Sequence, residues 1–266
     1  MYLDHWQLKH FPFENVGNPA YFFESEVVRT MLDDLQDAIE RRKGAVMLTG
    51  EIGCGKTTLI EHFLLALDEA RYDIALITYP CLEPLEMLRE INLQLGLDAD
   101  GSDRNAMLHA LQQHLANNAA NGRDTLICID EAQSIPSITT FEELRLLLNF
   151  KLPDRFLLTL MFVGQPELQK KINKLPQLKQ RIALHLHLGP LSEQDATEYM
   201  LHRLDAAGST RCILTRQAVD SVYRHTRGVP RRINHLADRC LMEGKRLNVT
   251  LLDSRLVNET MKHYSC

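Results

Sequence analysis

Two stretches of the sequence combine residue types that can act on a phosphate group. The first, Gly50-Glu51-Ile52-Gly53-Cys54-Gly55-Lys56-Thr57-Thr58, has the form GxxxxGK[ST] of a phosphate-binding loop, or P-loop. Its glycines let the backbone curl so that successive N–H groups point at one anion, where a side chain would intrude. In such a loop Lys56 reaches the β- and γ-phosphates, and the Thr57 hydroxyl binds Mg²⁺. The run therefore predicts a site for a nucleoside triphosphate.

The second stretch is the acidic pair Asp130-Glu131, which follows the apolar run 125–129. Asp130, at the carboxyl end of a strand, can hold Mg²⁺ and its water shell. Glu131 can orient and deprotonate the water that attacks the terminal phosphate. An acidic pair can also simply end a strand, but the P-loop upstream favours the catalytic interpretation. Together the two stretches predict Mg²⁺-dependent hydrolysis of ATP.

The elements around these stretches predict an α/β fold. Apolar runs predict strands at 45–49, 73–79, 125–129, 156–163 and 184–188. Apolar residues at helical spacing predict helices at 25–43, 59–65, 84–95, 105–118 and 138–149. Because strands that alternate with helices form parallel sheets, we expect a five-stranded parallel sheet. Along the chain, one predicted strand (73–79) lies between the P-loop strand and the Asp130 strand, and Glu131 adjoins Asp130. This arrangement favours ATPases that keep their own catalytic base over simple kinases and small GTPases.

The sequence becomes entirely helical after Gly189-Pro190. Ser192 with Asp195 resembles a capping box and begins a helix over 192–206. Further helices are expected at 215–227, from Pro230 onward, and after Asp253 as a cap. We therefore expect two domains. Residues 1–190 form the α/β domain, with an irregular aromatic segment at 1–24, and residues 191–266 form a small all-α lid.

Two further side chains are candidates for contacts with the nucleotide. Gln165 follows the fourth strand and could sit near the γ-phosphate, or it could be an ordinary turn residue. Arg231, at the start of a helix, could fold back over the nucleotide as part of the lid. It could also belong to a surface basic pair or to a nucleic-acid patch. A separate basic segment that could face DNA contains Lys170, Lys171, Lys174 and Lys179.

Composition limits the possible partners and compartment. The net charge of −5 and the pI near 6.1 give no overall attraction to nucleic acid or to an anionic membrane. The start of the chain is not a signal peptide, and no run approaches 18 apolar residues. We expect a cytoplasmic protein that meets the membrane only through partners. The six cysteines include no CxxC pair, which predicts reduced thiols rather than a zinc site.

The sequence resembles AAA+ ATPases of the general secretion pathway protein A (ExeA-like) type over nearly its whole length. Within that family it looks most like the short stand-alone form associated with biogenesis of the mannose-sensitive haemagglutinin (MSHA) type IV pilus. The most telling segments are Gly-Gln-Pro-Glu-Leu at 164–168 and Pro-Arg-Arg-Ile-Asn at 230–234, which related transposition ATPases share in similar form. The other matching segments are 11–13, 48–51 with the P-loop, 130–133, 180–182 and 190–191.

The resemblance implies roles for single residues. Gln165 would be the first sensor of the γ-phosphate and Arg231 the second sensor, on the lid. Arg181 would be an arginine finger inserted into a neighbouring subunit's site, which implies a ring or helical homo-oligomer. Family members often carry another arginine where this sequence has His185. Larger relatives continue into a transmembrane segment and a peptidoglycan-binding domain.

Several functions remain open at this point. The first is an ATPase that drives or regulates assembly of an envelope machine, a type IV pilus or a general secretion system, whose protein components would be its partners. The second is a DNA-binding ATPase of the transposition-helper kind, whose activity would be DNA-stimulated and salt-dependent. The third is a nucleotide-gated scaffold with little turnover, which Glu131 disfavours because a pure switch has less need of a base.

Overall fold

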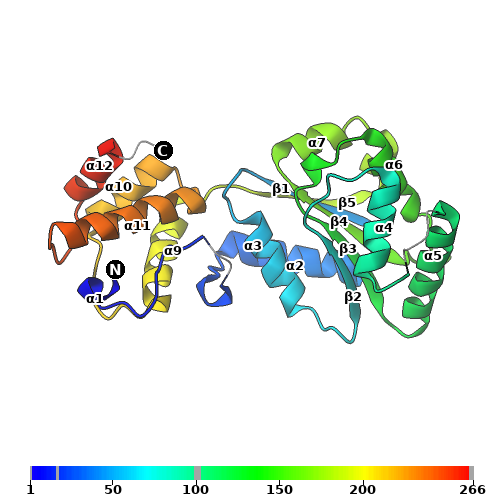
Figure 1. Cartoon of the computed structure of the whole chain (residues 1–266), viewed down its shortest axis with the longest axis horizontal. Coiled ribbons are helices and arrows are strands. Elements are labelled where there is room, and N and C mark those ends of the chain that lie inside the picture. The colour runs from blue at the N-terminus through cyan, green and yellow to red at the C-terminus, as the bar shows by residue number, and fades with distance from the viewer. Residues whose placement is uncertain (1, 16–17, 99–102, 264–266) are drawn as a thin grey trace. The chain divides into compact units, whose positions relative to one another are not determined.

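The computed structural model describes residues 2–15, 18–98 and 103–263. The chain divides into two compact units, each with its own core (Figure 1). One unit carries the sheet and comprises Glu26–Glu51 and Leu59–Leu188. The other is helical and comprises Met1–Ser25, Ile52–Thr58 and Gly189–Cys266. We call them the sheet unit and the helical unit.

The sheet contains five parallel strands, as the sequence predicts. They are β1 (Ala45–Gly50), β2 (Tyr72–Ile77), β3 (Asp124–Ile129), β4 (Leu158–Gly164) and β5 (Ile182–Leu188). Their order across the sheet is β2-β3-β4-β1-β5, so β4 lies between β1 and β3. The three central strands are buried along their whole length, which explains their continuous apolar sequences. Because all strands are parallel, the P-loop and the acidic pair begin at the same, carboxyl edge.

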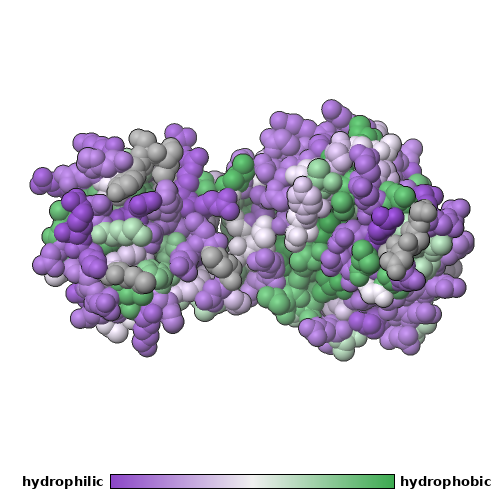
Figure 2. All heavy atoms as spheres, in the orientation of Figure 1, coloured by the Kyte–Doolittle hydropathy of each residue, from purple (hydrophilic) through white to green (hydrophobic). Residues whose placement is uncertain are grey.

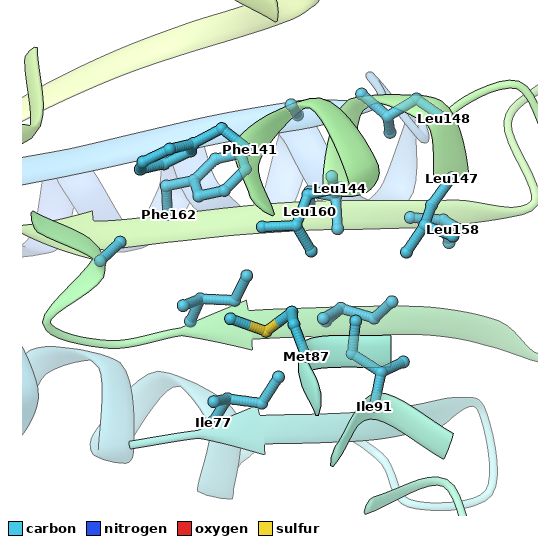
Figure 3. Close-up of a cluster of buried hydrophobic side chains, with 14 of the residues drawn as sticks. Ile77, Met87, Ile91, Phe141, Leu144, Leu147, Leu148, Leu158, Leu160 and Phe162 are labelled. Carbon is cyan, nitrogen blue, oxygen red and sulfur yellow. The ribbon is translucent and has the colours of Figure 1, made fainter. Parts of the chain in front are cut away.

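Helices cover both faces of the sheet. One face carries α4 (Pro84–Gln94), α5 (Arg104–Ala120), α6 (Ile138–Leu147), α7 (Pro166–Ile172) and α8 (Pro176–Lys179). Figure 1 shows α2 (Glu26–Glu40) and α3 (Lys56–Ala66) on the opposite face. On the first face, Phe141 from α6 meets Phe162 from β4 with ring centroids 6.1 Å apart, and Met87 and Ile91 of α4 reach toward the sheet (Figure 3). This apolar layer fixes the strands that end at the candidate site.

The helical unit contains α9 (Glu193–Ala206), α10 (Arg216–Thr226), α11 (Pro230–Arg246) and α12 (Ser254–His263), close to the helices that the sequence predicts. Ser192 is the N-cap of α9: its hydroxyl accepts a hydrogen bond from the Asp195 N–H at 3.0 Å and donates one to the Asp195 carboxylate at 2.7 Å, so the reciprocal bond to the Ser192 backbone that completes a capping box is replaced by a bond to its side chain.

The aromatic segment at the start of the chain packs with these helices, whereas we expected residues 1–24 in the α/β domain. The helical unit resumes at Gly189, next to the division that we expected near residue 190. Its elements are α1 (Leu3–Trp6) and the short 3₁₀ helix η1 (Pro19–Tyr21). Trp6 is 0% exposed, and its indole N–H donates to the Leu241 carbonyl at 2.9 Å. Arg203 donates to the carbonyls of Pro12 and Glu14. The physical reason is that a buried indole and a guanidinium both need carbonyl partners: α11 supplies the partner of Trp6, and the N-terminal segment supplies the partners of Arg203 on α9.

The amino edge of the sheet is held by pairs of oppositely charged side chains. Asp124, at the start of β3, is ion-paired with Arg42 from the end of α2. Asp73, in β2, accepts from the His114 ring at 2.5 Å and from the Asn118 amide at 2.7 Å, both on α5. These contacts tie α2 and α5 to the strand starts.

Within the described part of the chain, no helix is both long and apolar enough to cross a membrane. On the face shown in Figure 2, hydrophilic side chains dominate the surface, and apolar area is visible among them over the sheet unit. Five cysteines are free thiols, while Cys266 lies outside the described residues. Of these thiols, Cys81 and Cys212 are exposed and Cys54, Cys128 and Cys240 are buried.

Candidate functional site

The P-loop run has the strand–loop–helix context that phosphate binding requires. Gly50 is the last residue of β1, and Lys56 is the first residue of α3. Gly53 and Gly55 adopt left-handed backbone conformations with φ of 82° and 98°, which a residue with a Cβ atom rarely tolerates. Lys56 is only 6% exposed, although it carries a long cationic side chain. The loop is thus bent around the start of a helix, whose dipole favours an anion there.

Arg231 lies against this loop inside the helical unit. Its backbone N–H donates to the Gly53 carbonyl at 3.2 Å. A Cβ atom on Gly53 would come within 2.8 Å of the Arg231 Cβ, so only glycine allows this approach. Val229 is the N-cap of α11, and Pro230 occupies its first turn. The start of α11 therefore touches the P-loop, while the Arg231 side chain is exposed.

The acidic pair lies in the sheet unit at the carboxyl end of β3. Asp130 is 5% exposed, and its Oδ1 accepts the Glu131 N–H at 2.8 Å. Glu131 has a left-handed backbone with φ of 50°, which turns the chain sharply into the 3₁₀ helix η2 (Ala132–Ser134). Burial raises the pKa of the Cys128 thiol, and the negative charge of Asp130 adds to the effect. The acidic pair therefore directly follows a strand whose residues are all buried.

Two amide side chains contact the carboxylate of Glu131. The Gln133 amide donates to Glu131 Oε2 at 2.5 Å, and the Gln165 amide donates to the same atom at 3.3 Å. The Gln133 Oε1 atom accepts the Gln165 backbone N–H at 2.9 Å. Gln133 thus bridges the acidic pair after β3 to the residue after β4. Our sequence analysis proposed Gln165 and gave no role to Gln133.

Glycine and lysine residues support this bridge. A Cβ atom on Gly164 would lie 2.5 Å from the Gln133 Oε1 atom, so the bridge needs glycine at this strand end. Lys171 of α7 donates to the carbonyls of Gln133 and Ile135, both at 2.7 Å. The Lys171 ammonium therefore holds the turn after Glu131, and it does not extend toward solvent as a DNA-facing residue would.

Arg181 lies at the opposite edge of the sheet from Glu131. It directly precedes Ile182, the first residue of β5. Its guanidinium donates to the Leu148 carbonyl at 3.0 Å and to Asn149 Oδ1 at 2.8 Å. The structure therefore brings Glu131 and Gln165 together, and it separates Arg181 from them by the length of a strand.

Family and sequence comparisons relate the chain to known proteins. The family model described as an AAA domain matches residues 39–172. General secretion pathway protein A of Aeromonas hydrophila is 36% identical over 247 residues, which cover 91% of this chain and 44% of that protein. The chain thus spans less than half of that relative's length.

Solved structures share the fold. The ORC2 protein of Aeropyrum pernix, in ADPNP–ADP complexes, has a TM-score of 0.70 at 18% identity, covering 96% of this chain and 71% of that one. The RuvB Holliday junction branch migration motor of Thermotoga maritima has a TM-score of 0.58 at 19% identity, covering 96% and 73%. At such identities these likenesses speak for the fold alone. The family match, the fold and the relative agree, and the chain belongs to the AAA domain family, in which it is similar to general secretion pathway protein A.

Proposed function

We propose that this protein binds and hydrolyses ATP with Mg²⁺, and that Glu131 is the general base. The observation that carries the proposal is the position of Glu131 at the carboxyl edge of the sheet, where its carboxylate meets only amides among its described hydrogen bonds. The two amides hold the carboxylate in place without a cation beside it, and an ionised carboxylate has only acceptor oxygens, which a general base requires. The P-loop begins at the same edge, after β1.

The nucleotide would be held by residues 50–58. In this proposal the loop N–H groups bind the phosphates, and Lys56 neutralises the β- and γ-phosphates. Gln165 would contact the γ-phosphate as the first sensor. Its present bond to Glu131 suggests how the sensor acts, because a Gln165 amide that turns to the phosphate releases the base.

A hard cation fits the oxygen ligands available. Thr57 supplies a hydroxyl and Asp130 a buried carboxylate, which are the ligand types that Mg²⁺ prefers. No cluster of three or more His, Cys, Asp or Glu residues that could hold a metal occurs in the ranges that the structure describes. Mg²⁺ would bind together with the nucleotide, whose phosphate oxygens are further ligands of the type that it prefers. When bound, it would neutralise charge on the phosphates during transfer.

Arg231 would act as the second sensor on a lid formed by residues 191–266. The bond from the Arg231 N–H to the Gly53 carbonyl supports this role, because it ties the start of α11 to the P-loop itself. An arginine at this point can place its guanidinium on the phosphates when the lid closes. ATP binding would in this way be transmitted to the helical unit.

Arg181 would complete the site of a neighbouring subunit. Its place at the amino edge, away from Glu131 of its own chain, supports action in trans. Among the described residues its guanidinium contacts a carbonyl and an amide oxygen, which are weaker partners than a phosphate. A trans-acting arginine requires a homo-oligomer, a ring or a helix, which we propose forms with nucleotide.

We further propose that ATP turnover drives or regulates assembly of an envelope machine, a general secretion system or a type IV pilus of the MSHA kind. The support is the 36% identity to general secretion pathway protein A. The protein would act from the cytoplasm, at the inner membrane through protein partners.

The first test is steady-state ATP hydrolysis together with nucleotide binding. Glu131→Gln should lower turnover by about 10²- to 10⁴-fold, the range for a general base, while ATP affinity stays the same. Lys56→Ala should lose binding and turnover together. A Glu131→Gln protein with wild-type turnover would overturn the assignment of the base.

The second test addresses assembly and DNA. Arg181→Ala and Lys56→Ala proteins should each be inactive, and mixing them should restore part of the activity if Arg181 acts in trans. Absence of recovery would contradict the trans role. In parallel, molecular mass and ATPase rate are measured with and without duplex DNA at low and moderate salt. If duplex DNA raises the ATPase rate and salt weakens this effect, the proposed envelope-machine role is wrong and the DNA-dependent role is favoured.

A further inference from the structure

A groove of about 380 Å³ lies in the sheet unit between α7 and the edge strand β5. Helix α7 contributes Pro166, Gln169 and Lys170, strand β5 contributes residues 185–187, and Thr49 of β1 lies at its base. None of these residues belongs to the proposed nucleotide site. The groove therefore needs a separate explanation.

The groove carries one cationic side chain, Lys170, in an otherwise acidic protein. Its ionisable lining residues are Lys170, His185 and His187, and burial together with the nearby charge of Lys179 lowers the pKa of His185. Among the described residues, no Asp or Glu lines the groove. The whole sequence contains 35 Asp and Glu residues against 30 Lys and Arg residues. A local basic site of this kind attracts an anionic group.

The two histidines are placed by the register of the sheet. Met47 and Thr49 of β1 pair with His185 and His187 of β5, and residues two apart on a strand share one face. The His187 Nδ1 atom lies 3.0 Å from the Thr49 hydroxyl, which in turn donates to the Leu186 carbonyl at 3.2 Å. With Nδ1 engaged in this way, Nε2 is the remaining polar atom of the ring.

Strand β5 also offers main-chain partners. It is the last strand of the sheet and pairs with β1 on one side, and no described strand pairs with its other side. Ala183, His185 and His187 are exposed. An edge strand presents unpaired N–H and C=O groups that accept an extended peptide as an additional strand.

We propose that the groove binds an extended acidic segment of a partner protein, which adds to β5 as a strand and places a carboxylate against the Lys170 ammonium, beside the His187 ring. The main-chain bonds provide affinity, and the Lys170 ammonium selects an acidic residue over a neutral one of the same shape. Charge complementarity favours this occupant over an apolar one. The proposal is independent of ATP hydrolysis.

The test uses two fluorescein-labelled synthetic peptides, Thr-Val-Thr-Val-Glu-Val-Thr and the same peptide with Gln in place of Glu, titrated with protein that comprises residues 1–266. Fluorescence anisotropy should show binding of the Glu peptide at protein concentrations up to about 1 mM, and binding of the Gln peptide should be about tenfold weaker. Lys170→Glu should lower the affinity for the Glu peptide by about tenfold or more, which is the loss expected for one charge-assisted hydrogen bond.

The matched control is Lys174→Glu, which makes the same charge change at an exposed residue outside the groove lining and should bind like the wild type. Hydrogen exchange should show slower exchange of β5 amides with the Glu peptide bound. Equal binding of both peptides, no binding of the Glu peptide, or wild-type binding by Lys170→Glu would overturn the proposal. Light scattering completes the test: if Lys170→Glu abolishes self-association but leaves peptide binding intact, the occupant is a second copy of this chain and the proposal fails.

Discussion

At the amino edge of the sheet, carboxylates meet basic side chains, whereas at the carboxyl edge the carboxylate of Glu131 meets two amides. Asp124 is ion-paired with Arg42, and Asp73 contacts His114. Glu131 instead accepts bonds from Gln133 and Gln165. Both edges are polar and both are partly buried, so burial alone does not distinguish them.

The difference lies in what each pairing does to the charge. A cation next to a carboxylate balances its charge, and removal of either partner leaves the other charge uncompensated. An amide fixes the position of a carboxylate without cancelling its charge. The amino edge is therefore suited to stability and the carboxyl edge to proton transfer, and substitutions should affect stability at one edge and turnover at the other.

The largest effect on stability is expected at Asp124. Asp124→Asn leaves the Arg42 guanidinium without its charged partner at a mostly buried position, which should cost about 3 kcal/mol of unfolding free energy. Urea denaturation measures the loss, and ATP turnover per folded molecule should not change. The control is Asp37→Asn, which removes a more exposed ion-pair partner on α2 and should change stability little. Similar losses for both variants would contradict the structural role of the amino edge.

A smaller effect, confined to turnover, is expected at Gly164. Gly164→Ala places a methyl group where the Gln133 Oε1 atom lies, so Gln133 must release the Gln165 backbone. Turnover should fall about tenfold, equivalent to about 1.4 kcal/mol, with ATP affinity unchanged. Gly189→Ala is the matched control, because a Cβ atom there meets nothing within 4 Å. If Gly164→Ala turns over at the wild-type rate, the Gln133 bridge has no part in catalysis.

Lys171 tests whether the turn after Glu131 is held from α7. Lys171→Met keeps the aliphatic part of the side chain and loses the two bonds to the carbonyls of Gln133 and Ile135. Local opening of residues 132–135 should become easier by about 1 kcal/mol, which amide hydrogen exchange would detect. Lys174→Met, at an exposed position, should leave this exchange unchanged. Equal exchange in both variants would show that the two bonds from Lys171 do not stabilise this turn.

The smallest expected effect concerns the thiols and leaves the fold intact. Burial raises the pKa of Cys128 and raises the pKa of Cys240 to about 12, so neither forms thiolate at pH 8. Cys81, which follows β2 at the carboxyl edge, is exposed. Mass spectrometry after iodoacetamide treatment at pH 8 should find Cys81 and Cys212 alkylated before Cys128 and Cys240. Fast labelling of Cys128 would indicate that the sheet opens.

The sheet, the P-loop context and the acidic pair could be predicted from sequence because each is a local pattern. An apolar run, a glycine spacing and two acids after a strand are all visible within about ten residues. The role of Gln133 could not be predicted in this way. It depends on Gly164, which only the pairing of β3 with β4 brings close. Gln133 was visible in the motif of residues 130–133, but its contact with Gln165 arises only in the folded sheet.

The placement of the first residues failed for a related reason. Trp6 and Phe13 signal burial by their type, yet a short irregular segment has no periodicity that selects a core. Position in the chain suggested that this segment belongs to the α/β domain. In the structure it belongs to the helical unit, where Trp6 donates to a carbonyl of α11 and Arg203 donates to the carbonyl of Pro12. The anchoring of Arg181 likewise depends on Leu148 and Asn149, which reach it only through the folded sheet.

The burial of Trp6 has a consequence for synthesis in the cell. Its partner Leu241 lies 235 residues further along the chain. At about 5 to 20 residues per second, a ribosome needs roughly 10 to 50 seconds to make that stretch. During this time the sheet unit can be completed, while the aromatic N-terminal segment has emerged without the helices that cover it. We expect this segment to be a binding site for chaperones on the nascent chain, since it is synthesised well before the helices that bury it.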